Sequence, residues 1–179
     1  MQPMPADRTS LAGFRKSAGW PLRPVGDPLL AGVGPSSYAQ RSEHPELTRD
    51  GRLQIVPMRV ATEFGILGGA DPRGWQVIGG DKKVAGVVTD IWVDRADVMV
   101  RYLELEVQGG GRRLIPLPIL SIDRDIGKVR VSALLSHQFA QVPTTQDPDK
   151  VTIMEEERIS AFYAGGRMYA EPKRLGPIV

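Results

Sequence analysis

The chain has 179 residues, a formal net charge of +2 and no cysteine, which excludes disulfides, thiolate metal sites and cysteine nucleophiles. Its apolar fraction of 41% and charged fraction of 25% are ordinary for a globular protein, and the length suits one domain with an appended arm. Basic residues are scattered along the chain except at Lys173-Arg174, which argues against nucleic-acid binding.

Membrane-spanning and secretory segments are not predicted. The N-terminal sequence MQPMPADRTS lacks the apolar core of a signal peptide. The longest apolar run, LIPLPIL, is too short and too interrupted by proline to span a bilayer. We therefore expect the chain, as it stands, not to cross a membrane.

Residues 1–53 are predicted to form an extended arm. This region is rich in proline and glycine and sustains no period of 2 or 3.6 residues. Its aromatic residues indicate that it lies against another surface, and they are Phe14, Trp20 and Tyr38.

Residues 54–150 are predicted to form a small antiparallel β-barrel. Short segments rich in β-branched residues are separated by glycine or aspartate turns: QIVPMRV, VAGVVTDIWVD, VMVRYLELEV, RRLIPLPILSID and KVRVSALL. Their close spacing favours antiparallel pairing over a parallel sheet. The GGG run at 109–111 lies between two of these segments, which indicates a hairpin loop and not a phosphate-binding loop.

Residues 151–179 are predicted to form a helix followed by a basic tail, so that the fold class is mainly β with α. Carboxylates at 155–157 suit a helix N-terminus, where the helix dipole favours negative charge. Gly165-Gly166 are expected to end or kink the helix. The apolar residues that follow at helical spacing are Ile159, Phe162 and Tyr163.

Known catalytic motifs are missing from the sequence. GxSxG, a P-loop and a GxGxxG after a strand do not occur. The two histidines, His44 and His137, lack metal-ligand spacing, and His137 is interpreted as a surface or packing residue. The sequence therefore predicts a protein that is not an enzyme.

The stretch GVVTDIWVDRADVMVRYLELEV, residues 86–107, carries more charge than a hairpin needs. Asp90 and Asp94 bracket Trp92, and Asp97 lies in the turn. Strand alternation places Arg101 on one face with Met99, Leu103 and Leu105, where a buried guanidinium requires partners. Two interpretations stay open: turn chemistry with a paired core arginine, or carboxylates that hold protons for another purpose.

Several stretches resemble the H subunit of the purple-bacterial photosynthetic reaction centre, whose cytoplasmic part is a PRC-barrel. They run in the family's order over most of the chain, from about Ser10 to Arg174: GDPLLAGVGPSSY, PELTRDGRLQIVPMRV, VAGVVTDIWVDRADVMVRYLELEV, RRLIPLPIL and the run from VRVSALL to YAEPKR. DIWVD and YAGGxxYAxPxR are the most specific of these motifs. The family fold agrees with the predicted arm, barrel and helix.

The resemblance implies a non-catalytic subunit at the cytoplasmic face of the photosynthetic inner membrane. Such a subunit caps the L and M subunits, shields the quinone and iron region, and carries protons to the secondary quinone. It implies that this chain binds no cofactor itself, while the complex holds bacteriochlorophyll, bacteriopheophytin, quinones and non-haem iron.

The resemblance also assigns roles to residues. Asp94 and Asp97 fall at the family's carboxylates near the secondary quinone, although the family often has Glu at the second position, and Arg101 falls on the nearby arginine. Some relatives have two histidines where protons enter, but this chain has Asp50 and Arg52 there. Asp50, or His44 close before it, is expected to substitute for them.

The family's N-terminal transmembrane helix has no counterpart in this sequence. We expect the anchor to be a separate polypeptide or to have been trimmed, with antenna proteins as further partners. The alternative is a free-standing PRC-barrel adaptor in RNA processing or regulation. The aromatic arm and the YAGGRMYAEPKR ending favour the photosynthetic subunit, and a small-molecule-binding barrel lacks a convergent polar pocket signature in the sequence.

Overall fold

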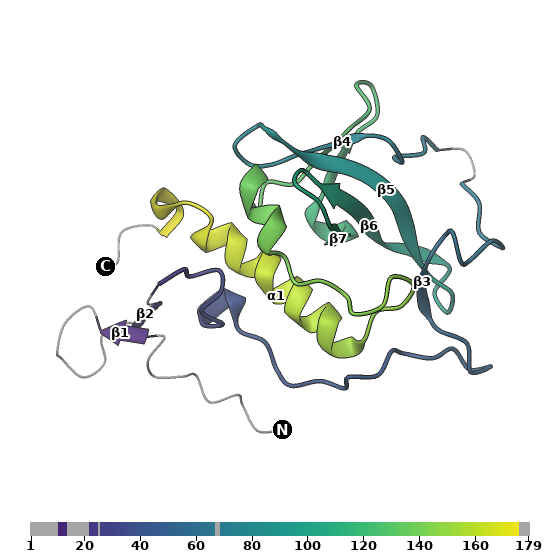
Figure 1. Ribbon diagram of the computed structural model, residues 1–179, viewed down its shortest axis with the longest axis horizontal. Coiled ribbons are helices and arrows are strands. Elements are labelled where there is room, and N and C mark those ends of the chain that lie inside the picture. The colour runs from purple at the N-terminus through teal and green to yellow at the C-terminus, as the bar shows by residue number, and fades with distance from the viewer. Residues whose placement is uncertain (1–10, 14–21, 25, 67–68, 176–179) are drawn as a thin grey trace.

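The computed structural model describes residues 11–13, 22–24, 26–66 and 69–175, in which one sheet packs beside a single α-helix (Figure 1). This confirms the predicted class, mainly β with one helix near the C-terminus. The strands of the main sheet are β3 (Ile55–Pro57), β4 (Gln76–Ile78), β5 (Val84–Asp94), β6 (Met99–Val107), β7 (Arg112–Pro116), β8 (Ser121–Asp123) and β9 (Lys128–Arg130). A separate antiparallel pair consists of β1 (Leu11–Gly13) and β2 (Leu22–Pro24).

The strand order of the sheet is β7-β6-β5-β4-β9-β8, and β3 pairs with β5 beyond the end of β4. All of these pairs are antiparallel except β4 with β9, which is parallel. The sheet is not closed by hydrogen bonds, because no pairing joins β7 to β8 in the described ranges. The predicted antiparallel barrel is therefore correct in outline, with one parallel pair and an open edge.

The β5–β6 hairpin forms the centre of the sheet. β5 has the predicted bounds, and it opposes β6 from Gly86↔Val107 to Asp94↔Met99. A Cβ at Gly86 would lie 2.0 Å from the Glu106 carbonyl oxygen, so only glycine permits this close strand contact. The 109–111 glycines form the β6–β7 loop with φ values of 96°, 100° and 94°, as predicted for a glycine hairpin loop.

The helix α1 (Ile153–Tyr169) covers one side of the sheet (Figure 1). Its first turn is capped by Thr152, whose hydroxyl accepts from Glu155 N–H while the Glu155 carboxylate accepts from Thr152 N–H. Of the short 3₁₀ segments, η5 (Pro172–Leu175) contacts α1, while η3 (Leu117–Ile119) contacts β6 and η4 (Ser136–Gln141) contacts β5. The largest fully buried side chains include Trp92, Leu103, Leu105, Ile115, Phe139, Ile159 and Tyr163.

The expectation that Gly165-Gly166 end or kink the helix is wrong, because α1 continues through both to Tyr169. A Cβ at Gly165 would lie 2.6 Å from the Ser36 Cβ, and a Cβ at Gly166 would lie 2.6 Å from the Ala133 carbonyl oxygen. These glycines therefore allow the helix to approach two neighbouring segments closely.

The segment 26–54 runs along α1 and contains the short η2 (Gly34–Ser36) (Figure 1). Backbone carbonyls of Ser42 and His44 accept from the N–H groups of Met154 and Ile153, at 2.9 and 3.2 Å. Donors at the start of the helix are thus satisfied by the segment. The Tyr38 ring lies 5.9 Å from the Arg158 guanidinium carbon. Phe14 and Trp20 lie outside the described residues, and the division at 1–53, 54–150 and 151–179 stays a prediction.

Candidate functional site

The turn between β5 and β6 presents the residues that sequence analysis singled out. It spans residues 95–98, with Val98 at a φ of 52°. Asp94 ends β5, Asp97 lies in the turn, and Arg101 is the third residue of β6. We call Asp94, Asp97 and Arg101, together with Tyr102 and Glu156, the hairpin-tip site.

Asp94 is 1% exposed and organises the turn. Its Oδ1 accepts from the N–H groups of Ala96 and Asp97, at 2.9 and 3.1 Å. Its Oδ2 accepts from Gln54 Nε2 at 3.1 Å, which joins the turn to the segment before β3. Local turn chemistry therefore accounts for most of the contacts of this carboxylate.

The other two predicted residues lie at the surface. Asp97 is exposed, and its contact with Asp94 is made by its backbone N–H and not by its carboxylate. The interpretation of Arg101 as a core arginine is wrong, because its side chain is 40% exposed. Its ion-pair partner is Glu156, at 3.7 Å, and neither Asp94 nor Asp97. Strand alternation predicted a buried Arg101 incorrectly, because the apolar face of β6 is buried only from Leu103 onward.

Glu156 and Tyr102 complete the site and were missed in the sequence analysis. The Tyr102 hydroxyl donates to Glu156 Oε1 at 2.6 Å. Burial raises the pKa of Glu156, and the charges of Glu46 and Asp94 raise it further, while the Tyr102 hydrogen bond and Arg101 lower it. Burial, followed by the charge of Glu156, also raises the pKa of Tyr102. Glu156 had been interpreted only as an acidic residue at a helix N-terminus, and nothing local links it to β6.

The predicted positions for proton entrance lie apart from the tip. Asp50 is exposed, with Thr48 Oγ1 at 2.5 Å and Arg52 Nε at 2.6 Å. The Thr48 hydroxyl, followed by Arg52, lowers the pKa of Asp50, so this carboxylate holds its proton weakly. His44 is exposed and uses its backbone N–H and C=O for contacts with Ser42 Oγ and Ile153 N–H.

Ion pairs nevertheless connect the Asp50 loop with the hairpin. Arg52 lies 3.8 Å from Glu63, which pairs with Arg95 at 2.8 Å. Arg95 follows Asp94 directly and donates its N–H to the Gln54 carbonyl. Charged side chains therefore run from the Asp50 loop to the tip, and the Arg95 side chain among them is only 13% exposed. No hydrogen bond joins Asp50 to Asp94 or Asp97 within the described ranges.

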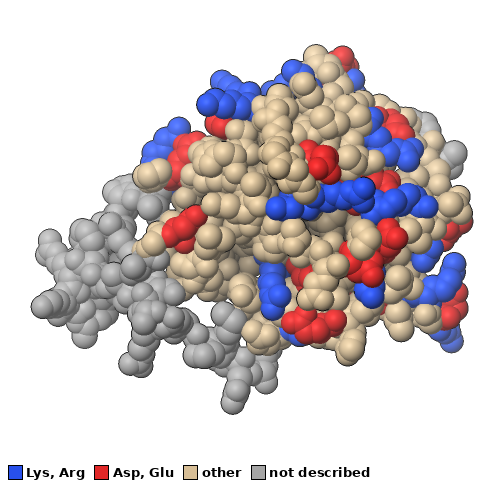
Figure 2. Space-filling model, viewed as in Figure 1, with Lys and Arg blue, Asp and Glu red and all other residues tan. Residues whose placement is uncertain are grey.

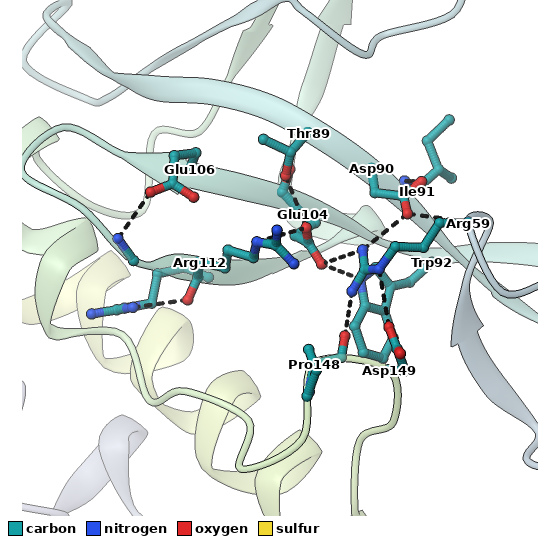
Figure 3. Close-up of polar contacts among 12 residues, drawn as sticks. Arg59, Thr89, Asp90, Ile91, Trp92, Glu104, Glu106, Arg112, Pro148 and Asp149 are labelled. Atoms are coloured by element: carbon teal, nitrogen blue, oxygen red, sulfur yellow. Dashed lines mark hydrogen bonds and ion pairs between the residues drawn. The ribbon is translucent and has the colours of Figure 1, made fainter.

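A second group of charges lies deeper in the sheet, and we call it the Arg59 cluster: Arg59, Asp90, Glu104 and Asp149 (Figure 3). Arg59 Nη1 lies 3.0 Å from both Asp90 Oδ2 and Glu104 Oε2, and Arg59 Nε lies 3.0 Å from Asp149 Oδ1. Its Nη2 donates to the Pro148 carbonyl. Trp92 Nε1 also donates to Glu104, at 3.0 Å. The sequence signal that could have indicated this cluster is a pair of acidic residues among apolar ones on two neighbouring strands, Asp90 on β5 and Glu104 on β6.

Charges of both signs are mixed on the face that Figure 2 shows. Across residues 11–13, 22–24, 26–66 and 69–175, no three His, Asp or Glu side chains are grouped as a metal would require. None of the helices in these ranges combines the length and the apolar character of a membrane crossing.

Comparison with protein families gives two matches, which together run from residue 2 to residue 135. Residues 2–60 match the family described as photosynthetic reaction centre, H-chain N-terminal region. Residues 64–135, which include β4 to β9, match the PRC-barrel domain. The two matches are consecutive and leave α1 and the tail outside them.

Proposed function

This chain belongs to the H-chain family of photosynthetic reaction centres, and we propose that it caps the L and M subunits and relays protons to the secondary quinone. The subunit itself is proposed to carry out no catalysis and to bind no pigment. Bacteriochlorophyll, bacteriopheophytin, quinones and non-haem iron belong to the complex that it completes, at the cytoplasmic face of the membrane. The H-chain match over residues 2–60 favours this role over a free-standing adaptor.

The single observation that carries the relay proposal is the contact of the largely buried carboxylate of Glu156 with the half-exposed Arg101 at the hairpin tip. Glu156 has a raised pKa through burial, and it contacts both Tyr102 and the half-exposed Arg101. A group whose pKa lies closer to neutral exchanges protons more readily at working pH than an ordinary carboxylate. Arg101 limits the negative charge that gathers there.

Apolar residues around the tip support docking of this face on L and M. Val98 and Met99 are 73% and 45% exposed. A groove of about 190 Å³ lies beside them, lined by Met99, Arg101, Leu117 and Pro118 among others. Exposed apolar side chains next to an arginine suit a protein interface, where aromatic residues, Met and Arg are enriched. Docking here brings the hairpin-tip site to the partner subunits.

Flash-induced kinetics on assembled reaction centres test the relay. We expect Glu156→Gln to slow the proton-coupled second electron transfer to the quinone by about tenfold, because it removes the titrating group but keeps the shape. The first electron transfer, which requires no committed proton, is expected to change little. Glu157→Gln, on the next residue of α1, is the control. Equal second-electron rates in wild type and Glu156→Gln contradict the role of Glu156.

A further inference from the structure

Val98, in the turn between β5 and β6, has two features that are unusual together. Its φ of 52° lies in the left-handed region, and its side chain is 73% exposed. No other large apolar side chain among the described residues is as exposed. The relay proposal uses the acids of the hairpin-tip site and explains neither feature.

The backbone conformation of Val98 disfavours valine. In the left-handed region the Cβ crowds the following carbonyl oxygen, so glycine or asparagine is the usual residue there. A β-branched residue is a clear exception at such a φ. The turn fixes this conformation through Asp94 Oδ1, which accepts from the N–H groups of Ala96 and Asp97. Backbone strain of this kind is concentrated where a protein meets a ligand or a partner.

Lys82 provides a comparison within the same chain. It is the only other non-glycine residue with a positive φ in the described ranges, at 63° in the β4–β5 turn. Its exposed side chain is charged and therefore well solvated. Val98 adds exposed apolar surface to the strained backbone. Glycine would remove both disadvantages in the free chain, so the stability of the free chain does not account for valine.

The apolar surface continues beyond Val98. Met99 follows directly and is 45% exposed, and it lines the groove of about 190 Å³ beside the turn. Adjacent exposed apolar side chains of this kind mark an interaction surface. Val98 lies at the outermost point of this surface, because it is the most exposed of its apolar residues.

Charges around Val98 indicate the chemistry of the partner. The carboxylate of Asp97 is exposed and has no ion pair or hydrogen bond among the described residues. The arginines on either side are already paired, Arg95 with Glu63 at 2.8 Å and Arg101 with Glu156 at 3.7 Å. The tip therefore presents an apolar side chain beside an uncompensated negative charge.

This combination favours a protein pocket over other surfaces. An anionic lipid surface repels a carboxylate. A second copy of the same tip would bring two like charges together. A pocket with an apolar base and Lys or Arg at its rim complements both Val98 and Asp97.

We propose that Val98 anchors the hairpin tip in an apolar pocket of a partner subunit whose basic rim faces Asp97, and that the strained turn is retained for this contact. The inference rests on the proposed docking of this face on the reaction-centre core. It assigns to one residue a role that opposes the stability of the free chain and favours assembly.

The variant Val98→Thr separates the apolar contact from the backbone strain. Threonine keeps the size and the β-branching of valine but replaces a methyl group by a hydroxyl. Urea unfolding of the isolated full-length chain is expected to be unchanged. The affinity of the chain for reaction-centre cores that lack it is expected to fall about tenfold, because the hydroxyl is buried in an apolar pocket.

The variant Val98→Gly relieves the strain and removes the side chain. We expect the folded-to-unfolded ratio of the isolated chain to rise about threefold, because glycine accepts the left-handed conformation. The affinity for the same cores is expected to fall about tenfold or more, because the apolar contact is lost. Lys82→Gly is the matched control, which is expected to raise the folded-to-unfolded ratio similarly and to leave the affinity unchanged.

Association kinetics test the basic rim. Asp97→Lys is expected to slow association with the cores at low salt, since reversal of a rim charge acts mainly on the association rate. Asp125→Lys, at an exposed aspartate in the β8–β9 turn, is the control. Equal association rates in the two variants overturn the basic rim.

The remaining outcomes are distinct. Equal affinities of wild type and Val98→Thr overturn the anchor role of Val98 and leave the docking proposal in place. A wild-type chain that does not bind the cores contradicts both. Flotation with phosphatidylglycerol vesicles that is lost in Val98→Thr, or a dimer that dissociates in Val98→Thr, assigns the tip to a lipid surface or to a second copy and overturns the proposal.

Discussion

The hairpin-tip site and the Arg59 cluster both bring acids and an arginine together, but they differ in how completely those charges are satisfied. In the Arg59 cluster, Asp90 and Glu104 have side chains only 6% and 3% exposed, and both contact one guanidinium. At the tip, Asp97 is exposed and Arg101 lies 3.7 Å from its acid. One region is a closed network and the other is open.

This difference separates structural charge from charge that can take part in function. A buried ion cluster with full hydrogen bonding holds segments together, and breaking it is severe. Arg59 links the turn after β3 to two strands and to residues 148–149. A loosely paired group near the surface costs little to alter, yet it can exchange protons and meet a partner. We therefore expect stability effects at Arg59 and functional effects at the tip.

The largest effect is expected for Arg59→Met. Loss of the guanidinium leaves Asp90 and Glu104 buried without their cation, which costs about 3 kcal/mol or more in the free energy of unfolding. Urea unfolding at pH 7 measures this.

Arg101→Met is the matched control at the tip, with a change of about 0–1 kcal/mol. If the two arginine variants unfold at the same urea concentration, the distinction between closed and open charge clusters is lost.

Asp94→Ala is expected to have the next largest effect on stability. Asp94 belongs to the tip, but its carboxylate is buried and hydrogen-bonded, as the acids of the Arg59 cluster are. Its removal leaves the N–H groups of Ala96 and Asp97 without their acceptor, at a cost of about 1–3 kcal/mol. Asp94→Asn keeps one acceptor oxygen and is expected to cost less. Thermal unfolding of both variants measures the difference, and a harmless Asp94→Ala contradicts the turn role of this carboxylate.

Strand content was predictable because β-branched segments and glycine turns act locally. The bounds of β5 and the glycine loop at 109–111 follow from such signals. The short β4 was missed, since it has only the three residues Gln76–Ile78 and pairs with two distant strands. The predicted helix end or kink at Gly165-Gly166 was wrong because these glycines allow close packing against Ser36 and Ala133, which no local pattern reveals.

The hairpin-tip site was only partly predictable, because part of it depends on contacts between segments that are far apart in the sequence. Asp94 and Asp97 could be found from one hairpin, although which of them is buried depends on Gln54 and the turn. Glu156 could not be linked to Tyr102, because 54 residues separate them and the contact exists only when α1 packs on β6. The roles of Asp94, Asp97 and Arg101 in proton transfer, and of Asp50 and His44 where protons enter, stay predictions.

A smaller effect is expected for Glu156→Gln on the stability of the isolated chain. The folded-state pKa of Glu156 is raised by burial above its ordinary value, so its contribution is fully present below the unfolded pKa and is lost as pH rises through the folded one. Glutamine cannot titrate and still accepts the Tyr102 hydrogen bond. We therefore compare the free energy of unfolding of the variant with that of wild type at each pH. The difference is expected to favour the variant more at pH 8 than at pH 4, by about 1 kcal/mol or less.

Urea unfolding at the two pH values measures this gain, and Glu157→Gln provides the control. A gain that is larger at pH 4 than at pH 8 reverses the sign and contradicts a raised pKa for Glu156.

The smallest change in stability, and the sharpest test of the open region, is expected for Asp97→Asn. Its carboxylate is exposed, and the hydrogen bond to Asp94 comes from the backbone, so unfolding should change by about 0.5 kcal/mol or less. Assembly of the proposed complex should survive for the same reason. If Asp97 passes protons, the second electron transfer to the quinone slows while the first is unaffected, since only the second is coupled to proton uptake.

Asp125→Asn is a matched control, because Asp125 is also an exposed aspartate in a hairpin turn, the one between β8 and β9. Because both variants replace an aspartate by asparagine, a difference in flash-induced kinetics between the two assembled complexes reports the position of the residue and not its type. A double variant of Asp97 and Glu156 extends the test: two groups on one route should give less than the sum of their separate effects. Normal second-electron kinetics in Asp97→Asn would remove this residue from the route and leave Glu156 as the titrating group of the tip.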